Sequence, residues 1–468
     1  MTLIAAEKTG AEWPESWRLL SHGIRTGRYT DPAFLKLEFE QLWTKVWQAA
    51  ARLDEIPARG DYTTYTIGDQ SVIIVRVDDD TIKAFHNVCP HRGTALSDGG
   101  CGHFEKDRII CPFHGWRWDL QGNNQFVLER HEFKSGKLED KDVALREVEH
   151  VVFAGFVFIN FDKNPIPFDD FISPVKQLLE DLAIGEMRNY WWKGIAVPAN
   201  WKVAQEAFFE GYHVPATHPQ LEVKAAAVVY GDDPNAEVEF THHNITTDAF
   251  PYGHGRFYAG KNTAMQGKTN YPDGFDPVDA MADRLNLLAE GMDAQVLKAD
   301  VEIARSLKGK PIPEGSSLGA EFVKALYTDA AKKQRPMPKP EPEVLGMWGG
   351  EFFIFPNLLI LPNAGNAMIY RVMPDARDPD KCTFEILSTK TYPADEAVPR
   401  AIREDVTDYM NPEQVLEIPR QDLGNIPRMQ KGLHSLGCKQ IWLAENYEKM
   451  IMNMHREMDK YLGAPTES

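Results

Sequence analysis

Two short pairs of cysteine and histidine stand at either end of one glycine-rich stretch. Cys89 and His91 are separated by one residue, and Cys111 and His114 by two. Each pair offers one soft sulfur and one imidazole nitrogen to a shared inorganic centre. This division suits a [2Fe-2S] cluster in which two histidines replace two cysteines on one iron. A zinc ion also accepts two cysteines and two histidines, but common zinc fingers pair like residues with like, so the order here favours the iron cluster.

A second candidate metal site follows at His213 and His218, which are five residues apart. On a regular helix this spacing would leave them about 140° from each other. Pro215 lies between them and distorts or ends a helix, so both imidazoles can converge on one ion. Two histidines alone are more often structural. A redox cluster needs an acceptor for its electrons, however. The chain has no Walker loop and no dinucleotide-binding glycine motif, so a metal bound by His213 and His218 is the expected acceptor.

A mononuclear Fe(II) site needs a carboxylate besides two histidines if it is to activate O2. We therefore expect a third ligand from a distant Asp or Glu. His242 and His243 are the rival histidine pair, but adjacent residues on a strand point to opposite faces, so we do not expect them to chelate one metal.

The composition restricts the class of protein. The 468 residues carry 51 Lys and Arg against 69 Asp and Glu, a net charge of −18, which disfavours nucleic acid as a partner. Five scattered cysteines predict a reducing cytoplasm and no disulfide framework. The most apolar runs, 151–161 and 352–361, are too short to cross a membrane and are typical of buried strands. The start of the chain does not have the pattern of a signal peptide.

The chain length predicts more than one domain. The sequence pattern changes along the chain, from helical spacing before about residue 48 to short strands after it. We expect N-terminal helices over 1–47, an all-β cluster domain over 48–163 and a catalytic mononuclear iron domain over 164–468. The elements that must position the candidate ligands are short strands at 62–67, 72–77 and 82–87, strands near 190–197 and 367–373, and helices at 31–47, 171–182, 278–307 and 441–462.

The segments 89–93 (CPHRG) and 111–116 (CPFHGW) resemble the Rieske motif of Rieske non-heme iron ring-hydroxylating oxygenases, terminal oxygenase α subunits. The resemblance extends from Asp31 to Leu462. It implies an α+β fold in which an all-β Rieske [2Fe-2S] domain is inserted in or precedes a larger α+β helix-grip (START-like) catalytic domain. The expected cofactors are the [2Fe-2S] cluster and mononuclear Fe(II).

The same resemblance assigns two acidic residues. The stretch from Gln421 to Gln430 resembles the family's late acidic motif, which implies Asp422 as the third iron ligand; Asp405, Asp408 and Glu417 are the nearby alternatives. Glu210 precedes His213 by three residues. By the resemblance it is a catalytic residue that links His213 to His114 of the partner subunit, and otherwise it is a surface charge or a group that orients His213.

The resemblance implies a terminal oxygenase that takes electrons from a ferredoxin or flavin reductase and uses O2 to cis-dihydroxylate an aromatic substrate. The alternative within the family is monooxygenation, including O- or N-demethylation. A homotrimer is expected, with or without β subunits, acting on a small apolar or aromatic substrate beside Phe208, Phe209, Phe353 and Phe355. Two other readings are a Rieske electron carrier fused to a ligand-binding domain and a zinc-stapled binding protein.

Overall fold

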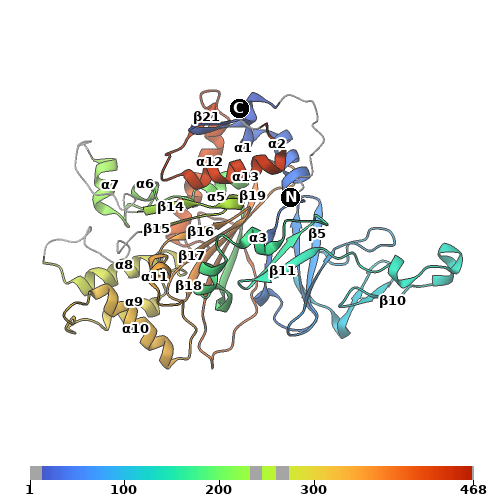
Figure 1. Cartoon of the computed structure of the whole chain (residues 1–468), viewed down its shortest axis with the longest axis horizontal. Helices are drawn as coiled ribbons and strands as arrows, with labels where there is room; N and C mark the ends of the chain where they lie inside the picture. Colours follow the sequence, from blue (N-terminus) through green and yellow to red (C-terminus); the bar gives the residue numbers. More distant parts are fainter. Residues whose placement is uncertain (1–12, 232–244, 260–273, 466–468) are drawn as a thin grey trace. The chain divides into compact units, whose positions relative to one another are not determined.

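This computed structural model describes residues 13–231, 245–259 and 274–465, so His242 and His243 lie outside the described residues. The described chain divides into two units (Figure 1). The smaller unit, called the cluster unit below, holds Trp43–Phe171 and Pro399–Ile402. The larger unit, the catalytic unit, takes the described residues up to Leu42, those from Ile172 to Val398 and those from Arg403 onward.

The unit boundaries lie a few residues from those expected at 47/48 and 163/164. Trp47 explains both differences, because its indole Nε1 donates to the carbonyl of Ile166 at 2.7 Å and its ring packs on Phe168 at 5.3 Å. The ends of the cluster unit are therefore held by each other. The amide of Ala401 donates to the carbonyl of Asp54 at 2.8 Å, which adds a short late segment that sequence periodicity did not indicate.

The cluster unit is built from three antiparallel sheets. One has the order β6-β5-β4-β7, the second β10-β9-β8 and the third β11-β12-β3. Their strands are β3 (Gln48–Arg52), β4 (Asp61–Ile67), β5 (Gln70–Arg76), β6 (Ile82–His86), β7 (Cys101–His103), β8 (Arg108–Ile110), β9 (Arg117–Asp119), β10 (Asn124–Phe126), β11 (Glu149–Phe153) and β12 (Phe156–Asn160). The strands expected at 62–67, 72–77 and 82–87 correspond to β4, β5 and β6 within one or two residues.

The catalytic unit is organised around an eight-stranded sheet with the order β14-β15-β16-β17-β18-β19-β13-β20. All neighbours are antiparallel except β13 and β20. The strands are β13 (Arg188–Val197), β14 (Ile245–Ala249), β15 (Gly255–Ala259), β16 (Glu351–Ile354), β17 (Leu358–Pro362), β18 (Asn366–Pro374), β19 (Cys382–Lys390) and β20 (Glu404–Val406). A small sheet, β1 (Leu19–Leu20), β2 (Gly23–Arg25) and β21 (Gln440–Trp442), lies in the same unit.

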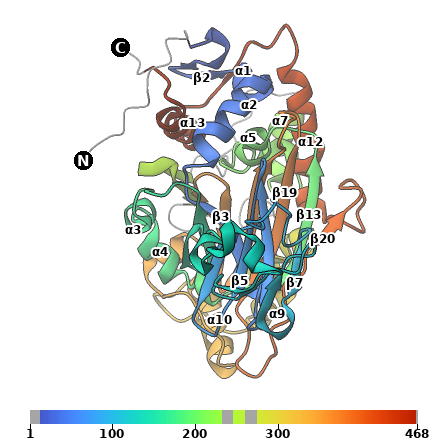
Figure 2. The same ribbon diagram turned by 90° about the vertical axis from the view of Figure 1, so that its right-hand side faces the viewer.

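Helices cover this sheet and carry the second candidate site. Helix α5 (Trp201–Glu206) packs on β18 and β19, α12 (Glu417–Leu433) packs on α5, and α13 (Lys449–Leu462) packs on β14 and β15 (Figures 1 and 2). The remaining helices of this unit are α1 (Gly27–Thr30), α2 (Pro32–Glu38), α4 (Lys176–Asp181), α6 (Val214–Thr217), α7 (Val223–Tyr230), α8 (Pro277–Met292), α9 (Lys298–Arg305), α10 (Leu318–Lys332) and α11 (Pro342–Gly346); α3 (Phe168–Ile172) crosses the unit boundary.

Several expected elements are subdivided in the structure. The runs 151–161 and 352–361 are hairpins, β11-β12 and β16-β17, rather than single strands. The first turns at Ala154 and Gly155, both with positive φ. In place of the single helix expected over 31–47, the chain forms α2 followed by a π-helical turn at Phe39–Trp43. The expected helices 171–182 and 278–307 are each split in two, and the C-terminal helix starts at Lys449 because β21 uses the residues before it.

No helix within residues 13–231, 245–259 and 274–465 is both long and apolar enough to cross a bilayer.

Candidate metal centres

The two cysteine and histidine pairs occupy matching turns of the cluster unit. The amide of Gly93 donates to the carbonyl of Cys89 at 3.0 Å, and the amide of Gly115 donates to the carbonyl of Cys111 at 3.0 Å. Both glycines have positive φ, 78° and 70°, a conformation that side chains with a Cβ rarely adopt. Each Cys-to-Gly segment therefore closes the same tight turn and presents a cysteine and a histidine from its tip.

The side chains of the two turns meet in like pairs, histidine with histidine and cysteine with cysteine. The Nδ1 atoms of His91 and His114 are 3.2 Å apart, while Cys89 and Cys111 are each 2% exposed. Burial, followed by the neighbouring Cys111 thiol, raises the pKa of Cys89 to about 11. One pair of neighbouring imidazole nitrogens and one pair of neighbouring buried thiols match a cluster with unlike irons, one bound through nitrogen and one through sulfur. The residues present thus fit a Rieske cluster.

Aromatic packing holds the histidine side of this centre. The Trp116 ring stacks on His91 with centroids 4.7 Å apart and an interplanar angle of 10°, and Phe133 meets both rings edge-on. Trp118 is fully buried, and its Nε1 donates to the carbonyl of Val143 at 2.7 Å. Both tryptophans are packing residues of the core that surrounds the two cysteines.

The second centre begins where α5 ends. Asn200 caps α5 by accepting from the amide of Lys202 at 3.0 Å, which fits the preference of asparagine for this position. Beyond α5 the chain turns through Phe208 to Glu210 and reaches His213. Helix α6 then lasts only four residues, with Pro215 in its first turn, and ends at His218. The short helix and its proline bring the two imidazoles to one side, with ring centroids 5.4 Å apart.

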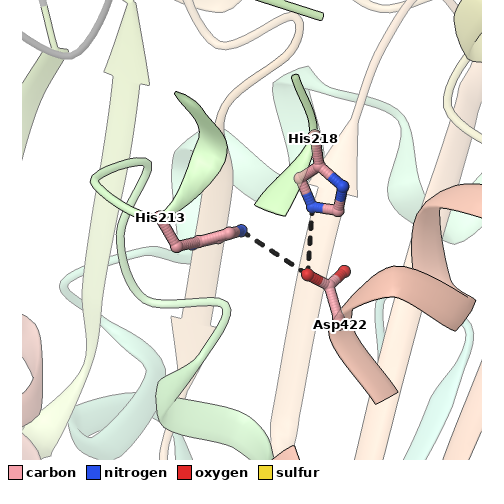
Figure 3. A group of neighbouring side chains, drawn as sticks. All are labelled: His213, His218 and Asp422. Atoms are coloured by element: carbon pink, nitrogen blue, oxygen red, sulfur yellow. Dashed lines mark ion pairs between the residues drawn. The ribbon is translucent and has the colours of Figure 1, made fainter. Parts of the chain in front are cut away.

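Asp422, on α12, completes a group of three possible ligands (Figure 3). Its Oδ1 lies 3.0 Å from His218 Nε2 and 3.7 Å from His213 Nε2. The ligand atoms of all three residues lie within 4.8 Å of one another. Two imidazoles and one carboxylate facing a common point form the donor set that non-heme Fe(II) takes, and they leave other positions around the ion open. The donor set therefore fits a mononuclear iron.

Each histidine is oriented through its other ring nitrogen. His213 Nδ1 lies 2.9 Å from Glu210 Oε1, and the His213 amide donates to Glu210 Oε2 at 2.9 Å. His218 Nδ1 lies 2.7 Å from Gln421 Oε1. Burial lowers the pKa of His213, but the charge and hydrogen bond of Glu210 and the charge of Asp422 outweigh burial and raise it to about 9. Both Nε2 atoms are left facing Asp422.

Sequence reasoning missed Gln421. The available signal was its place directly before Asp422, which on a helix gives it a direction different from that of the carboxylate. Gln430 also has a role in the structure, because its Oε1 accepts from the Asn200 amide at 3.1 Å. This contact joins α12 to the start of α5, so the helix that carries Asp422 is tied to the segment that carries both histidines.

The alternative carboxylates are not brought to this centre. Asp405 and Asp408 are exposed, as is Glu417, the first residue of α12. Asp422 differs from them because it lies one turn or more inside α12 and is only 6% exposed.

The four phenylalanines expected near the iron are all buried. Phe208 packs on Tyr370 with ring centroids 4.3 Å apart, and Phe209 packs on Phe353 at the same distance. Both contacts join the turn that leads to Glu210 to one face of the sheet. Phe355 instead meets Tyr461 of α13 at 6.1 Å.

Two family models match the chain. The one described as "Ring hydroxylating alpha subunit (catalytic domain)" matches residues 180–464, and the one described as "Rieske [2Fe-2S] domain" matches residues 46–146. The second range contains both cysteine and histidine pairs, and the first contains the three candidate iron ligands.

Curated relatives are similar over part of their length. The glycine betaine monooxygenase oxygenase subunit of Chromohalobacter salexigens is 34% identical over 217 residues, which is 46% of this chain and 47% of that protein. The carnitine monooxygenase oxygenase subunit of Escherichia coli K12 is 33% identical over 196 residues, 41% of this chain and 50% of that protein. The chain thus spans about half the length of the curated relatives it matches.

Solved structures show the same fold over nearly the whole chain. A quaternary ammonium Rieske monooxygenase in complex with its substrate L-carnitine has a TM-score of 0.60 at 18% identity, covering 94% of this chain and 96% of that chain. Naphthalene 1,2-dioxygenase with indole bound in its active site has a TM-score of 0.61 at 18% identity, covering 94% and 92%. Because the catalytic-domain model matches residues 180–464, this chain belongs to the family of ring-hydroxylating α subunits, with a Rieske [2Fe-2S] domain and a mononuclear iron catalytic domain.

Proposed function

We propose that this chain is the oxygenase subunit of a multicomponent Rieske monooxygenase that oxidises a small N-methylated ammonium compound with O2. The observation that carries the proposal is the convergence of His213, His218 and Asp422 in a chain that also carries the Rieske residues. A cluster that relays electrons and an iron site with open positions together indicate oxygen chemistry rather than electron storage.

The ligand assignments follow from the two geometries. Cys89 and Cys111 would hold one iron of the cluster, and His91 and His114 the other through their Nδ1 atoms. His213, His218 and Asp422 would hold the ferrous ion. When bound, these groups supply one-electron transfer and O2 activation.

The protein's own residues prepare this chemistry. Glu210 and Gln421 each take a hydrogen bond from an Nδ1 of a histidine, so that both Nε2 atoms face Asp422, beside which the ferrous ion would be held. The buried rings of Phe208 and Phe209 hold the turn before Glu210 against the sheet. Glu210 is also the residue proposed to link His213 to His114 of the partner subunit, which would carry electrons across the interface of a homotrimer.

The substrate class is taken from the relatives. Those named above act on glycine betaine and carnitine, and both are monooxygenases by name. The sequence alone favoured aromatic cis-dihydroxylation with monooxygenation as the alternative, and the relatives support the alternative. Naphthalene dioxygenase is similar at 18% identity, a likeness in fold. A ferredoxin or flavin reductase would donate the electrons, and a cytoplasmic location suits both the donors and the free cysteines.

The test is to supply the iron-loaded protein with a reductase and to offer glycine betaine, carnitine, choline and naphthalene under labelled oxygen. We expect one labelled oxygen per turnover and release of formaldehyde from an ammonium compound. Two labelled oxygens in a cis-diol of naphthalene would favour dihydroxylation. Metal analysis distinguishes the oxygenase from the two other hypotheses. About three irons per chain are expected for the oxygenase, and about two would indicate an electron carrier. Zinc in place of iron would indicate a binding protein that zinc stabilises.

A further inference from the structure

The large sheet of the catalytic unit carries a buried carboxylate, Glu351, that belongs to neither candidate metal centre. Glu351, the first residue of β16, is 1% exposed, and its Oε1 has no hydrogen-bond partner within the described part of the chain. An unpaired charge in such a place is costly unless something compensates it. Glu351 does not belong to the group of possible metal ligands at His213, His218 and Asp422.

Glu385 of β19, in the same sheet, shows what compensation looks like. It is also 1% exposed, but Arg371 Nε lies 2.7 Å from one of its oxygens and Arg403 Nη1 lies 3.1 Å from the other. The sheet thus neutralises one buried glutamate with two guanidinium groups. Among the residues that the structure describes, none pairs with Glu351 Oε1, so a positive group from outside the chain can fill that role.

Strand alternation places Glu351 on the face that looks toward the iron ligands. Residues two apart on a strand share a face, so Glu351 and Phe353 point the same way. Phe353 pairs with Leu359, and Leu359 pairs with Tyr370, which extends this face across three strands. Phe353 packs on Phe209, directly before Glu210.

Tyr370 on this face packs on Phe208 of the same turn. The carboxylate therefore shares its face with aromatic rings that touch the segment leading to His213. Aromatic ring faces attract cations, and quaternary ammonium groups are recognised by such rings.

The electrostatics of this region agree with the geometry. Burial, and then the negative charge of Glu210, raise the pKa of Glu351 well above its usual range. Burial and the charges of Asp422 and Glu351 raise the pKa of Tyr370. These four groups are close enough to sense one another, and the groups that act on Glu351 include no cation. Within the described part of the chain, this face therefore gives Glu351 a negative neighbour, Glu210, and no cation that lowers its pKa.

We infer that Glu351 is the counter-ion for a cationic substrate headgroup, a methylated ammonium, which the neighbouring aromatic rings flank. This inference rests on the proposed function and deepens it, because it assigns the residue that would select a charged substrate over a neutral one. Neither the two metal centres nor the residues that orient their ligands require Glu351. Its role is recognition, and substitution should change which compounds bind and leave both metals in place.

The experiment compares choline with 3,3-dimethylbutan-1-ol, which has the same shape and no charge. Binding to the metal-loaded protein is measured by calorimetry, independently of turnover. The wild type should bind choline more tightly, and Glu351→Gln should weaken choline binding at least about tenfold while leaving the alcohol unchanged. Because an ionising Glu351 would release its proton, choline binding by the wild type should release up to about one proton, and binding by Glu351→Gln should not.

Leu359→Met, which changes the same face without changing its charge, is the matched control and should keep the preference for choline. Iron content and cluster absorption are measured in every variant, so that misfolding is detected directly. Equal choline affinity in the wild type and Glu351→Gln, or no binding of choline by the wild type, would overturn the inference. Selective binding of choline without oxygenation would instead support Glu351 and count against the proposed monooxygenase.

Discussion

The two candidate metal centres of this protein are built in opposite ways. Each half of the Rieske centre is a turn closed by local hydrogen bonds, such as that from Gly93 to Cys89 or from Gly115 to Cys111. The mononuclear centre joins two histidines from one irregular segment to Asp422, which comes from a helix about 200 residues later. The first centre depends on backbone geometry within a few residues, whereas the second depends on how helices pack on the large sheet.

This contrast teaches where each centre is vulnerable. A cluster turn can be lost by changing a ligand or the glycine that closes it. The mononuclear centre also depends on contacts that hold the distant segments together, such as Gln430 with the Asn200 amide. Four predictions test the contrast, beginning with the largest effect.

The strongest test separates the two centres completely. Asp422→Ala should remove the mononuclear iron, because two neutral imidazoles alone bind Fe(II) weakly, and should leave the visible absorption of the cluster intact. Iron should fall from about three to about two atoms per chain. Cys111→Ser is the reciprocal variant and should lose the cluster absorption while about one iron stays. Retention of full iron in Asp422→Ala would contradict the assignment of this ligand.

Glu210 tests whether the mononuclear centre communicates beyond itself. Glu210→Ala, loaded with excess Fe(II), should hold both metals and lose turnover by at least about 100-fold. Glu210→Asp is the conservative control, which keeps a carboxylate and should recover part of the activity. The decisive measurement is the rate of electron transfer from the cluster to the mononuclear iron in a single turnover. A normal rate in Glu210→Ala would show that Glu210 does not carry electrons between subunits.

Gln421 tests how far orientation of a ligand matters. Gln421→Ala deprives His218 Nδ1 of its acceptor and should weaken Fe(II) affinity about 10- to 100-fold without changing the cluster. The matched control is Gln220→Ala, since Gln220 Nε2 donates to Gln421 Oε1 at 2.9 Å and its removal leaves the acceptor of His218 Nδ1 in place. Titration with Fe(II) compares the affinity of the two variants for the metal. Equal affinities would show that Gln421 does not orient His218.

The smallest expected effect concerns Glu206, the last residue of α5, and the dependence of the protein's stability on pH. Glu206 accepts from Tyr29 and contacts His455 Nε2 at 2.8 Å; burial raises its pKa to about 8 from 4.5. Between these values the folded state binds more protons than the unfolded state, so this group's stabilisation is full below about pH 4.5 and is lost as pH rises toward 8. The loss is at most about 1.4 kcal/mol per pH unit.

Glu206→Gln should flatten this dependence. The window from about pH 7.5 to 8 is the most informative, because burial lowers the pKa of His455 in the folded protein, and about one unit above its ordinary value of about 6.5 this residue is largely neutral in the unfolded chain as well. Denaturation midpoints measured across the window provide the comparison. A wild-type slope no steeper than that of Glu206→Gln would show that Glu206 is ionised in the folded protein.

Prediction from sequence succeeded where neighbouring residues are enough to specify the structure. The cluster ligands were recognisable because each sits in a turn whose cysteine, histidine and glycine are contiguous. The strands β4, β5 and β6 were recognisable because alternation and turn residues are local signals. The hairpins at 151–161 and 352–361 were missed, because in each an uninterrupted apolar run contains the turn. Ala154 takes a positive φ there, which its residue type does not indicate.

By itself, the sequence determined the family and the two kinds of metal centre and predicted their candidate ligands, because metal ligands are restricted to a few residue types in recognisable local patterns. Only the tertiary structure decided that Asp422, and neither Glu417 nor Asp405, lies against the histidines, and that Gln421 orients His218. It also decided that, among the described residues, Glu385 has two arginine partners while Glu351 has an oxygen with none. Burial and charge pairing are properties of groups brought together from distant parts of the chain, and no local pattern specifies them.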